Sequence, residues 1–447
     1  MKRANLDTGT ITPQSEDFGE IRRLVSHRLF LDPSYNTFDA MAEMTIATED
    51  YIQNLAQRFP PNVLWVGGSL GRGEMLPNSD IDLFVVYDAA SETNNEIRVE
   101  GVDKFEIGHI DRLKLHNLLQ YSFIDANRFI DGRSIGLAPA GHVESMIFDV
   151  NTPDRQLANN ISEYFYYRYF DFPQKTTTMG PNLKYSTGSS RDTIFFNMIS
   201  RMTSGKFPAT RGNHPELPEA TDYVSGRYGI TAPNSAIDLL FLTKNAAISV
   251  FDATRDPSTR YVSHRTLDAI YAFCKSKFVT LGYKDSYEYI DAYKAARNEL
   301  ELSVDTLFTM ALNEHPAKQE LARFLNLSGS DLAKEFVAEV KDQQVKYPQS
   351  TIAFGGWLAM RESLPAQYME QMAESLMQQP IDRTWGGLMA VVCSPSTADN
   401  TLSKLADWLY VHEKGAYLTK LITRNPSSSS QTKEKALSNY KEKEIII

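Results

Sequence analysis

The sequence predicts an α+β protein in which a small mixed β-sheet with flanking helices is followed by mostly α-helical domains. Segments rich in β-forming residues lie between residues 63 and 110, whereas helical patterns dominate after about residue 150. The chain has 447 residues, of which 42% are hydrophobic, so it can bury a large core in more than one domain. We expect domains at 1–150, 151–310 and 311–425, and a flexible polar tail at 426–447.

Charge and composition disfavour several kinds of partner and site. The formal net charge of −10 repels nucleic acid and anionic membranes, which makes a nucleic-acid partner unlikely on electrostatic grounds. Cys274 and Cys393 are far apart and lack metal-binding spacing, so neither a zinc site nor a disulfide framework is indicated. Because no signal peptide and no apolar run of membrane-spanning length is evident, we expect a soluble cytoplasmic protein without a membrane partner.

The expected elements of the first domain begin with a helix over residues 36–59. This helix must end at Pro60-Pro61. The apolar residues with helical spacing in it are Met41, Met44, Ile52, Leu55 and Phe59. Segments rich in β-formers follow: VLWV at 63–66, DIDLFVVY at 80–87, and a strand pair with a tight turn at Glu100-Gly101 in IRVEGVDKFEIGHI at 97–110. Between the first two strands, GGSLGRGE predicts a turn into a short helix.

The expected elements after residue 150 are helices. NSAIDLLFLTKNAAISVF, at 234–251, predicts a helix with Ser235 as the candidate N-cap. Further helices are expected at 317–346, 365–378 and 399–422, with their Met and aromatic positions in the core.

Two carboxylates one residue apart open the second predicted strand. Side chains at i and i+2 of a strand share a face, so Asp80 and Asp82 point the same way while Ile81 and Leu83 point into the core. Paired carboxylates supply the oxygen ligands that Mg²⁺ prefers, and they can bridge two metals that also bind substrate phosphates. A solvated acidic edge of a hairpin would show the same pattern without binding a metal.

The glycine-rich turn before these carboxylates predicts a phosphate site. Gly67 and Gly68 lack Cβ atoms, so the backbone can turn tightly and present N–H groups to an anion at the start of the next helix. Ser69 adds a hydroxyl for the same phosphates. Arg72 is a candidate for neutralising their charge, although a salt-bridged surface Arg explains it equally well.

The spacing from the glycine pair to the D-x-D resembles the signature of the DNA polymerase β-like nucleotidyltransferase superfamily. The resemblance implies a third carboxylate from a neighbouring strand, which helps to hold the catalytic metal. In VDKFEIGHI, Glu106 emerges beside Asp80 and Asp82 if Phe105 and Ile107 face the core; Asp103 is the second choice. The implied site has two Mg²⁺ ions, with Mn²⁺ as a substitute, held by Asp80, Asp82 and Glu106.

Longer segments look like one branch of that superfamily, the uridylyltransferases that modify the PII protein. GGSLGRGEMLPNSDIDLF, EIGHIDRLKL and GPNLKYSTGSSRD are similar to three motifs of that family, in the same order. The resemblance implies transfer of a nucleoside monophosphate from a nucleoside triphosphate, such as UTP or ATP, to a protein acceptor. It makes Lys184 and Arg191 candidate nucleotide contacts, whereas His109, on a strand, is more often a hydrogen-bonded structural histidine than a catalytic one.

The departures from that family leave room for rival functions. Ser69 replaces an aromatic residue and Ser190 a glycine, so base and acceptor preferences can differ. No His-Asp dipeptide occurs and nothing after residue 310 resembles the family's phosphohydrolase or glutamine-sensing modules, which predicts a stand-alone transferase. KFEI also matches antibiotic nucleotidyltransferases, so a small-molecule acceptor is the main rival. A non-catalytic nucleotide-binding regulator and a toxin or defence enzyme are also compatible with the sequence.

Overall fold

The computed structural model divides the chain into two compact units. The residues it describes are 18–56, 63–87, 105–111, 115–116, 119, 129, 132–135, 141–150, 152–176, 180–204, 217–412 and 416–444. Unit 1 comprises Met1–His116, Asn127–Phe148 and Lys175–Met310. Unit 2 comprises Asn117–Ala126, Asp149–Gln174 and Ala311–Ile447.

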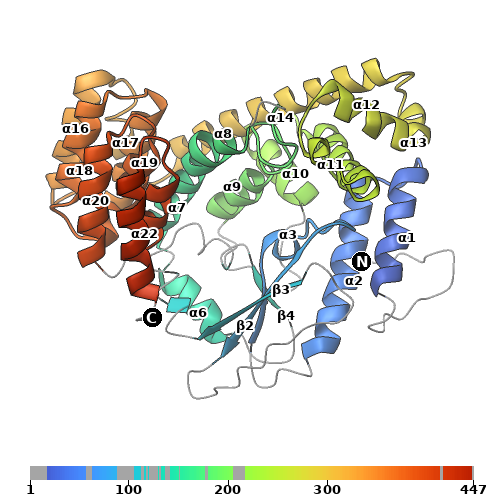
Figure 1. The fold of residues 1–447 in the computed structure, drawn as a ribbon, viewed down its shortest axis with the longest axis horizontal. Coiled ribbons are helices and arrows are strands. Elements are labelled where there is room, and N and C mark those ends of the chain that lie inside the picture. Colours follow the sequence, from blue (N-terminus) through green and yellow to red (C-terminus); the bar gives the residue numbers. More distant parts are fainter. Residues whose placement is uncertain are drawn as a thin grey trace. The chain divides into compact units, whose positions relative to one another are not determined.

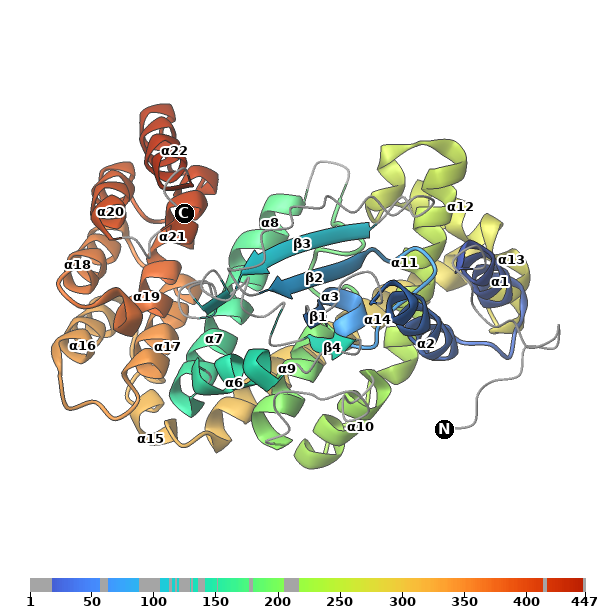
Figure 2. The same cartoon turned by 90° about the horizontal axis from the view of Figure 1, so that it is seen from below.

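Unit 1 contains a four-stranded mixed sheet with the strand order β3-β2-β1-β4. Its strands are β1 (Val63–Val66), β2 (Ile81–Tyr87), β3 (Phe105–Asp111) and β4 (Arg133–Ile135). Strand β1 is antiparallel to β2 and to β4. Strands β2 and β3 run parallel, as Figure 2 shows. The predicted α+β class is thus confirmed, as are strands at VLWV, in DIDLFVVY and in FEIGHI. Residues 97–104, with the predicted turn, lie outside the described residues, and the short β4 was not predicted.

Two long helices precede the sheet in sequence, α1 (Phe18–Leu31) and α2 (Thr37–Ala56) (Figure 1). Helix α2 is the helix predicted at 36–59, and it buries Met41, Met44 and Ile52 as expected. Residues 57–62 and the Leu55 side chain lie outside the described part. Phe18 stacks on Tyr51 with ring centroids 4.7 Å apart, which joins the two helices.

The other helices of unit 1 follow the sheet segments or interrupt them. They are α3 (Gly68–Gly71), α6 (Gly141–Val150), α9 (Ile194–Ser204), α10 (Leu217–Tyr228), α11 (Asn234–Thr254), the 3₁₀ turn η2 (Pro257–Arg260), α12 (His264–Phe273), α13 (Lys275–Thr280) and α14 (Ser286–Glu314). Helix α3 is the short helix predicted after the glycine turn. The predicted N-cap Ser235 is wrong, because Pro233 precedes the first helical residue and α11 begins at Asn234.

Unit 2 is helical throughout its described residues. Its elements are α7 (Pro153–Phe165), the π-helix η1 (Tyr166–Asp171), α8 (Phe172–Lys175), α15 (Lys318–Leu321), α16 (Gly329–Lys341), α17 (Pro348–Arg361), α18 (Ala366–Leu376), α19 (Ile381–Cys393), α20 (Asp399–Val411), α21 (Ala416–Arg424) and α22 (Ser430–Glu444). We placed the second domain at 151–310, whereas the structure assigns Asp149–Gln174 to unit 2 because α7 packs against α17 and α19.

Several predicted helices of unit 2 differ from the observed ones in their bounds. The helix expected at 317–346 is divided into α15 and α16, because residues 322–328 form turns and coil; Gly329, with a φ of +53°, is the first residue of α16. The helix expected at 399–422 is divided into α20 and α21. The tail expected at 426–447 contains α22, in which Ala436 is buried and Asn439 Nδ2 donates to the Ala406 carbonyl of α20 at 3.1 Å.

Two further findings concern the helices and the cysteines. Within the described part of the chain, no helix combines the length and the apolar character that crossing a bilayer requires. Cys274 and Cys393 are both free and buried.

Candidate active site

The glycine turn and the acidic pair are in direct contact in unit 1. Gly68 has a φ of +58°, and a Cβ atom at this position would lie 2.0 Å from the Asp82 carboxylate oxygen Oδ2. The backbone N–H of Gly67 donates to the Asp82 carbonyl at 3.0 Å. Only glycine combines this left-handed conformation with so close an approach, so the turn brings backbone amides up to the carboxylate.

The two aspartates lie at the beginning of β2. Asp80 is exposed directly before the strand and Asp82 is partly exposed within it, whereas Ile81 and Leu83 are fully buried. The predicted alternation of acidic and core positions is therefore present. Both carboxylates remain accessible to solvent and to a ligand.

Strand β3 adds the third predicted carboxylate position. Glu106 pairs with Asp82 in the parallel register of β2 and β3, and paired residues of neighbouring strands lie on the same face of a sheet. The side chains of Glu106 and His109, and the whole of Asp103 and Arg112, lie outside the described part of the chain. The backbone register is thus compatible with an acidic cluster that includes Glu106.

The donor set suits a hard divalent cation. Asp80 and Asp82 present carboxylate oxygens, the ligands that Mg²⁺ and Mn²⁺ accept, and both are accessible. Among the described side chains no group of three His, Cys, Asp or Glu residues is close enough to hold a metal.

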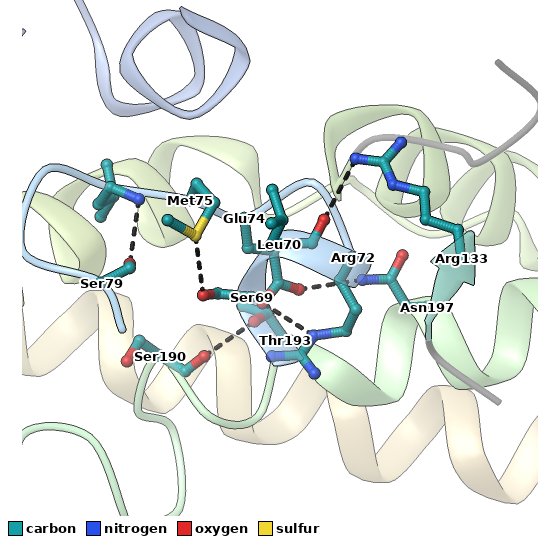
Figure 3. Close-up of polar contacts among 11 residues, drawn as sticks. Ser69, Leu70, Arg72, Glu74, Met75, Ser79, Arg133, Ser190, Thr193 and Asn197 are labelled. Carbon is teal, nitrogen blue, oxygen red and sulfur yellow. Dashed lines mark hydrogen bonds and ion pairs between the residues drawn. The ribbon is translucent and has the colours of Figure 1, made fainter. Parts of the chain in front are cut away.

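The turn after α3 is stabilised by a buried ion pair (Figure 3). Arg72 Nε donates to Glu74 Oε2 at 3.0 Å, and the other oxygen, Oε1, accepts from Asn197 Nδ2 of α9 at 3.0 Å. Both charged side chains are almost fully buried. Arg72, predicted near the phosphates, thus also holds the turn against α9. The sequence did not single out Glu74 or Asn197. For Glu74, the spacing of two residues from Arg72 in GRGE could have indicated an ion pair.

The segment between the turn and β2 is held by side chains on both sides. Ser69 Oγ donates to Met75 Sδ at 3.3 Å, and Ser79 Oγ accepts from the Leu76 N–H at 3.0 Å (Figure 3). Arg22 of α1 donates to the Ser79 carbonyl at 2.6 Å. Burial lowers the pKa of Arg22, and the nearby negative charge of Asp80 opposes that shift. Arg22, which sequence reasoning missed, therefore fixes the chain directly before Asp80.

The segment GPNLKYSTGSSRD forms an ordered loop before α9. Asn182 Oδ1 accepts from the N–H groups of Lys184 and Tyr185 at 2.9 and 3.1 Å. Gly188 has a φ of +66°, and its N–H donates to Asp192 Oδ2 at 2.7 Å. Several residues of this segment thus set the conformation of the loop. Its cationic side chains are Lys184 and Arg191.

Cationic side chains surround the ring of Tyr185. Lys175 Nζ lies 3.6 Å from the ring centroid, Lys184 Nζ lies 5.1 Å away and Arg191 Cζ lies 5.9 Å away. Lys244 of α11 lies elsewhere, with its Nζ atom 5.1 Å from the ring centroid of Phe241, but the charges of Lys184 and Arg191 contribute to lowering its pKa. Lys175 and Lys244 were missed because α8 and α11 are distant from the motifs in sequence.

The region that contains the glycine turn and the two aspartates matches a known type of domain. The family model for the nucleotidyltransferase domain matches residues 49–134, which include β1, α3, β2, β3 and most of β4. No curated protein matches the sequence significantly. Residues 49–134 are therefore a nucleotidyltransferase domain of the polymerase β-like superfamily, and the general chemistry of this domain is nucleotidyl transfer from a nucleoside triphosphate.

Proposed function

We propose that the protein is a divalent-metal-dependent enzyme that transfers a nucleoside monophosphate to a hydroxyl group of a protein acceptor and releases pyrophosphate. The observation that carries the proposal is the contact between Gly68 and Asp82, where a Cβ atom would lie 2.0 Å from the carboxylate. This contact supports the proposal because the glycine turn, which is the proposed phosphate site, lies beside an acidic residue, as transfer at the α-phosphate requires.

The acidic residues have the role of metal ligands in this proposal. Asp80 and Asp82 together hold the cations, and Glu106, whose backbone pairs with Asp82, completes the set. Bound there, a pair of Mg²⁺ or Mn²⁺ ions would lower the pKa of the attacking hydroxyl and neutralise charge on the leaving pyrophosphate. Arg22 positions Asp80 through its hydrogen bond to the Ser79 carbonyl.

The remaining predicted residues bind the nucleotide. The backbone N–H groups at Gly67 and Gly68 and the Ser69 hydroxyl face the phosphates in this proposal. Lys184 and Arg191 supply positive charge from the loop before α9. Arg72 adds charge from its buried pair with Glu74 and keeps the turn rigid.

The acceptor class comes from the likeness to the PII uridylyltransferases. Three segments between residues 67 and 192 resemble motifs of that family and follow one another in the same order, and the acidic chain disfavours an RNA acceptor. Ser69 and Ser190 depart from that family, so both UTP and ATP are candidate donors. The acceptor hydroxyl would belong to a protein side chain that enters beside Asp80.

The Asp82→Ala variant tests the chemistry. We expect nucleotide transfer, measured as pyrophosphate release with Mg²⁺ or Mn²⁺, to fall by several orders of magnitude because a metal ligand is lost. The fold should be retained, since removing one of two neighbouring carboxylates relieves repulsion. Asp50→Ala, in the helix α2, is the control and should release pyrophosphate at the wild-type rate. Near-normal transfer by Asp82→Ala would refute the proposal.

Labelled triphosphates identify the acceptor. The wild-type protein and the Asp82→Ala variant are each incubated with one of the four labelled nucleoside triphosphates. A cell extract that lacks this protein supplies the possible acceptors. Mass spectrometry should find a nucleoside monophosphate on a protein hydroxyl only with the wild type. Modification of an aminoglycoside in a parallel screen, without any protein product, would instead support a small-molecule acceptor.

A further inference from the structure

A buried arginine of β4 reaches the turn that contains Gly68. Arg133 Nη2 donates to the carbonyl oxygen of Leu70, the third residue of α3, at 3.2 Å (Figure 3). The same nitrogen forms an ion pair with Oε1 of Glu49, which belongs to α2. The two side chains are almost completely buried, with exposed fractions of 9% for Arg133 and 12% for Glu49. One cationic group therefore ties the short helix of the turn to a helix that precedes the sheet in sequence.

The register of the sheet places Arg133 next to this turn. Arg133 is the residue of β4 that pairs with Val66, the last residue of β1, and the glycine turn follows directly. The two strands approach closely at this end, because a Cβ atom at Gly132 would lie 2.1 Å from Trp65 Nε1 and 2.5 Å from the Val66 carbonyl oxygen. Glycine at position 132 thus permits the approach that brings the guanidinium group to α3.

The Leu70 carbonyl is part of the hydrogen bonding that closes the turn. Besides the bond from Arg133, this oxygen accepts from the backbone N–H of Gly73 at 3.2 Å. The carbonyls of residues 67–69 likewise accept from backbone N–H groups within residues 71–74. Movement of the Leu70 carbonyl would therefore disturb a continuous set of hydrogen bonds that determines the backbone of the turn.

The two buried arginines at the turn have different partners. Burying a charge is costly unless it is paired, so Arg133 depends on Glu49 as Arg72 depends on Glu74. Glu74 also binds Asn197 of α9, which holds the turn from the helical side. Arg133 holds it from β4 and α2, so two separate sets of elements fix its position.

We propose that Arg133 is a positioning residue of the nucleotidyltransferase site, which fixes the glycine turn through the Leu70 carbonyl while Glu49 keeps its guanidinium group in place. Its effect on the site is indirect and passes through Gly68, where a Cβ atom would meet the Asp82 carboxylate. The inference rests on the proposed function only in naming a nucleoside triphosphate as the ligand of the turn.

A pair of double variants tests the inference without leaving a buried charge unpaired. Glu49→Gln/Arg133→Met removes the hydrogen bond to Leu70 together with both charges of the ion pair. Arg28→Met/Glu43→Gln is the matched control, because it removes a partly buried Arg–Glu pair between α1 and α2 of the same unit. Glu49→Gln alone keeps the shape of the side chain and is the milder variant. Melting temperatures show whether each variant is folded.

Hydrogen exchange followed by mass spectrometry reports on the turn itself and requires no catalysis. In Glu49→Gln/Arg133→Met we expect the amides of residues 71–74 to exchange about tenfold faster relative to those of β2 than in the wild type. The amides of β2 report opening of the whole unit, so a merely structural role would leave this ratio unchanged. Glu49→Gln alone should raise the ratio by about threefold, and the control should not change it.

Steady-state kinetics of pyrophosphate release provide the second measurement. The KM for the triphosphate should rise about tenfold in Glu49→Gln/Arg133→Met, with a smaller change in kcat. The reason is that the turn is the proposed phosphate site, whereas the acidic residues are not altered. The Arg28→Met/Glu43→Gln control should keep the wild-type KM.

Each outcome supports or refutes a defined claim. An unchanged exchange ratio at residues 71–74 in both Glu49→Gln and the double variant overturns the inference, and so does an equal rise in the control. An unchanged KM in a double variant that transfers nucleotide also overturns it. A higher exchange ratio in the double variant, with no pyrophosphate released by the wild type from any nucleotide, leaves the role of Arg133 in the turn standing and refutes the proposed function.

Discussion

Two glycines of unit 1 occupy positions where a side chain would collide with a neighbour. A Cβ atom at Gly68 would lie 2.0 Å from Asp82 Oδ2, and one at Gly188 would lie 2.2 Å from the Arg297 carbonyl oxygen. Both residues also have a φ in the left-handed region. One glycine shapes the turn beside the carboxylates and the other the loop that carries Lys184 and Arg191, so each acts through the backbone.

The Gly68→Ala variant should therefore impair the site more than the fold. The left-handed conformation costs about 1–2 kcal/mol for a residue other than glycine, which should appear as lower stability in urea unfolding. Displacement of Asp82 should reduce nucleotide transfer by about 100-fold or more. Gly19→Ala, on an exposed position of α1 with open space around it, is the matched control and should leave transfer unchanged. Equal activities of the two variants would contradict the role assigned to Gly68.

Sequence reasoning found the residues of this site that lie in local motifs. Gly68, Asp80 and Asp82 are separated by only a few residues, and their conformations follow from glycine chemistry and strand alternation. Arg22 and Lys175 could not be found in this way, because they contact Ser79 and Tyr185 from α1 and α8. Their contribution depends on contacts between elements, which a single sequence does not encode in any short pattern.

At the scale of secondary-structure elements, the sequence did not predict helices α17 and α19. Both are apolar on nearly all sides, and every residue from Ser350 to Met360 is buried. Such a helix lacks the polar face that reveals an amphipathic helix, and each contains a glycine pair that disfavours helix formation in isolation. The pairs instead allow the two helices to approach closely, since a Cβ atom at Gly386 would lie 2.4 Å from Ala353 Cβ.

The Gly386→Ala variant tests that close packing. We expect a loss of about 1–3 kcal/mol in the free energy of unfolding, because the added methyl group meets the Ala353 backbone as well as its side chain. Gly226→Ala, in α10, is the control: it meets nothing within 4 Å and should stabilise its helix by about 0.5–1 kcal/mol. Urea unfolding followed by circular dichroism gives both values. Stabilisation by Gly386→Ala would show that the helices are not packed in this way.

At the scale of the whole molecule, both units are discontinuous in sequence. The chain leaves unit 1 after Phe148, contributes α7 and η1 to unit 2, and returns to unit 1 at Lys175. Within unit 2, Leu157, Ile161 and Phe165 of α7 are fully buried. The C-terminal helices of unit 2 thus form a core with α7, although α7 precedes residues 175–310 of unit 1 in the sequence.

A chain that ends at Met310 should consequently fold poorly. It retains α7 but lacks α17 and α19, so the apolar side chains of α7 lose their partners and become exposed. We expect this fragment to aggregate or to bind the dye ANS strongly, whereas a chain ending at Glu444 should behave like the full-length protein. A soluble fragment with a cooperative unfolding transition and no ANS binding would contradict this assignment of α7.

The sequence by itself determined strands β1, β2 and β3, the glycine turn and the acidic pair, because each depends on interactions between residues close in the chain. It also determined the α+β class, since strand-forming and helical segments occur in separate regions. Only the tertiary structure decided the assignment of α7 to unit 2, the buried glycine pairs and the cationic group around Tyr185. These features depend on which distant segments share a core, and that choice follows from the packing of the whole chain.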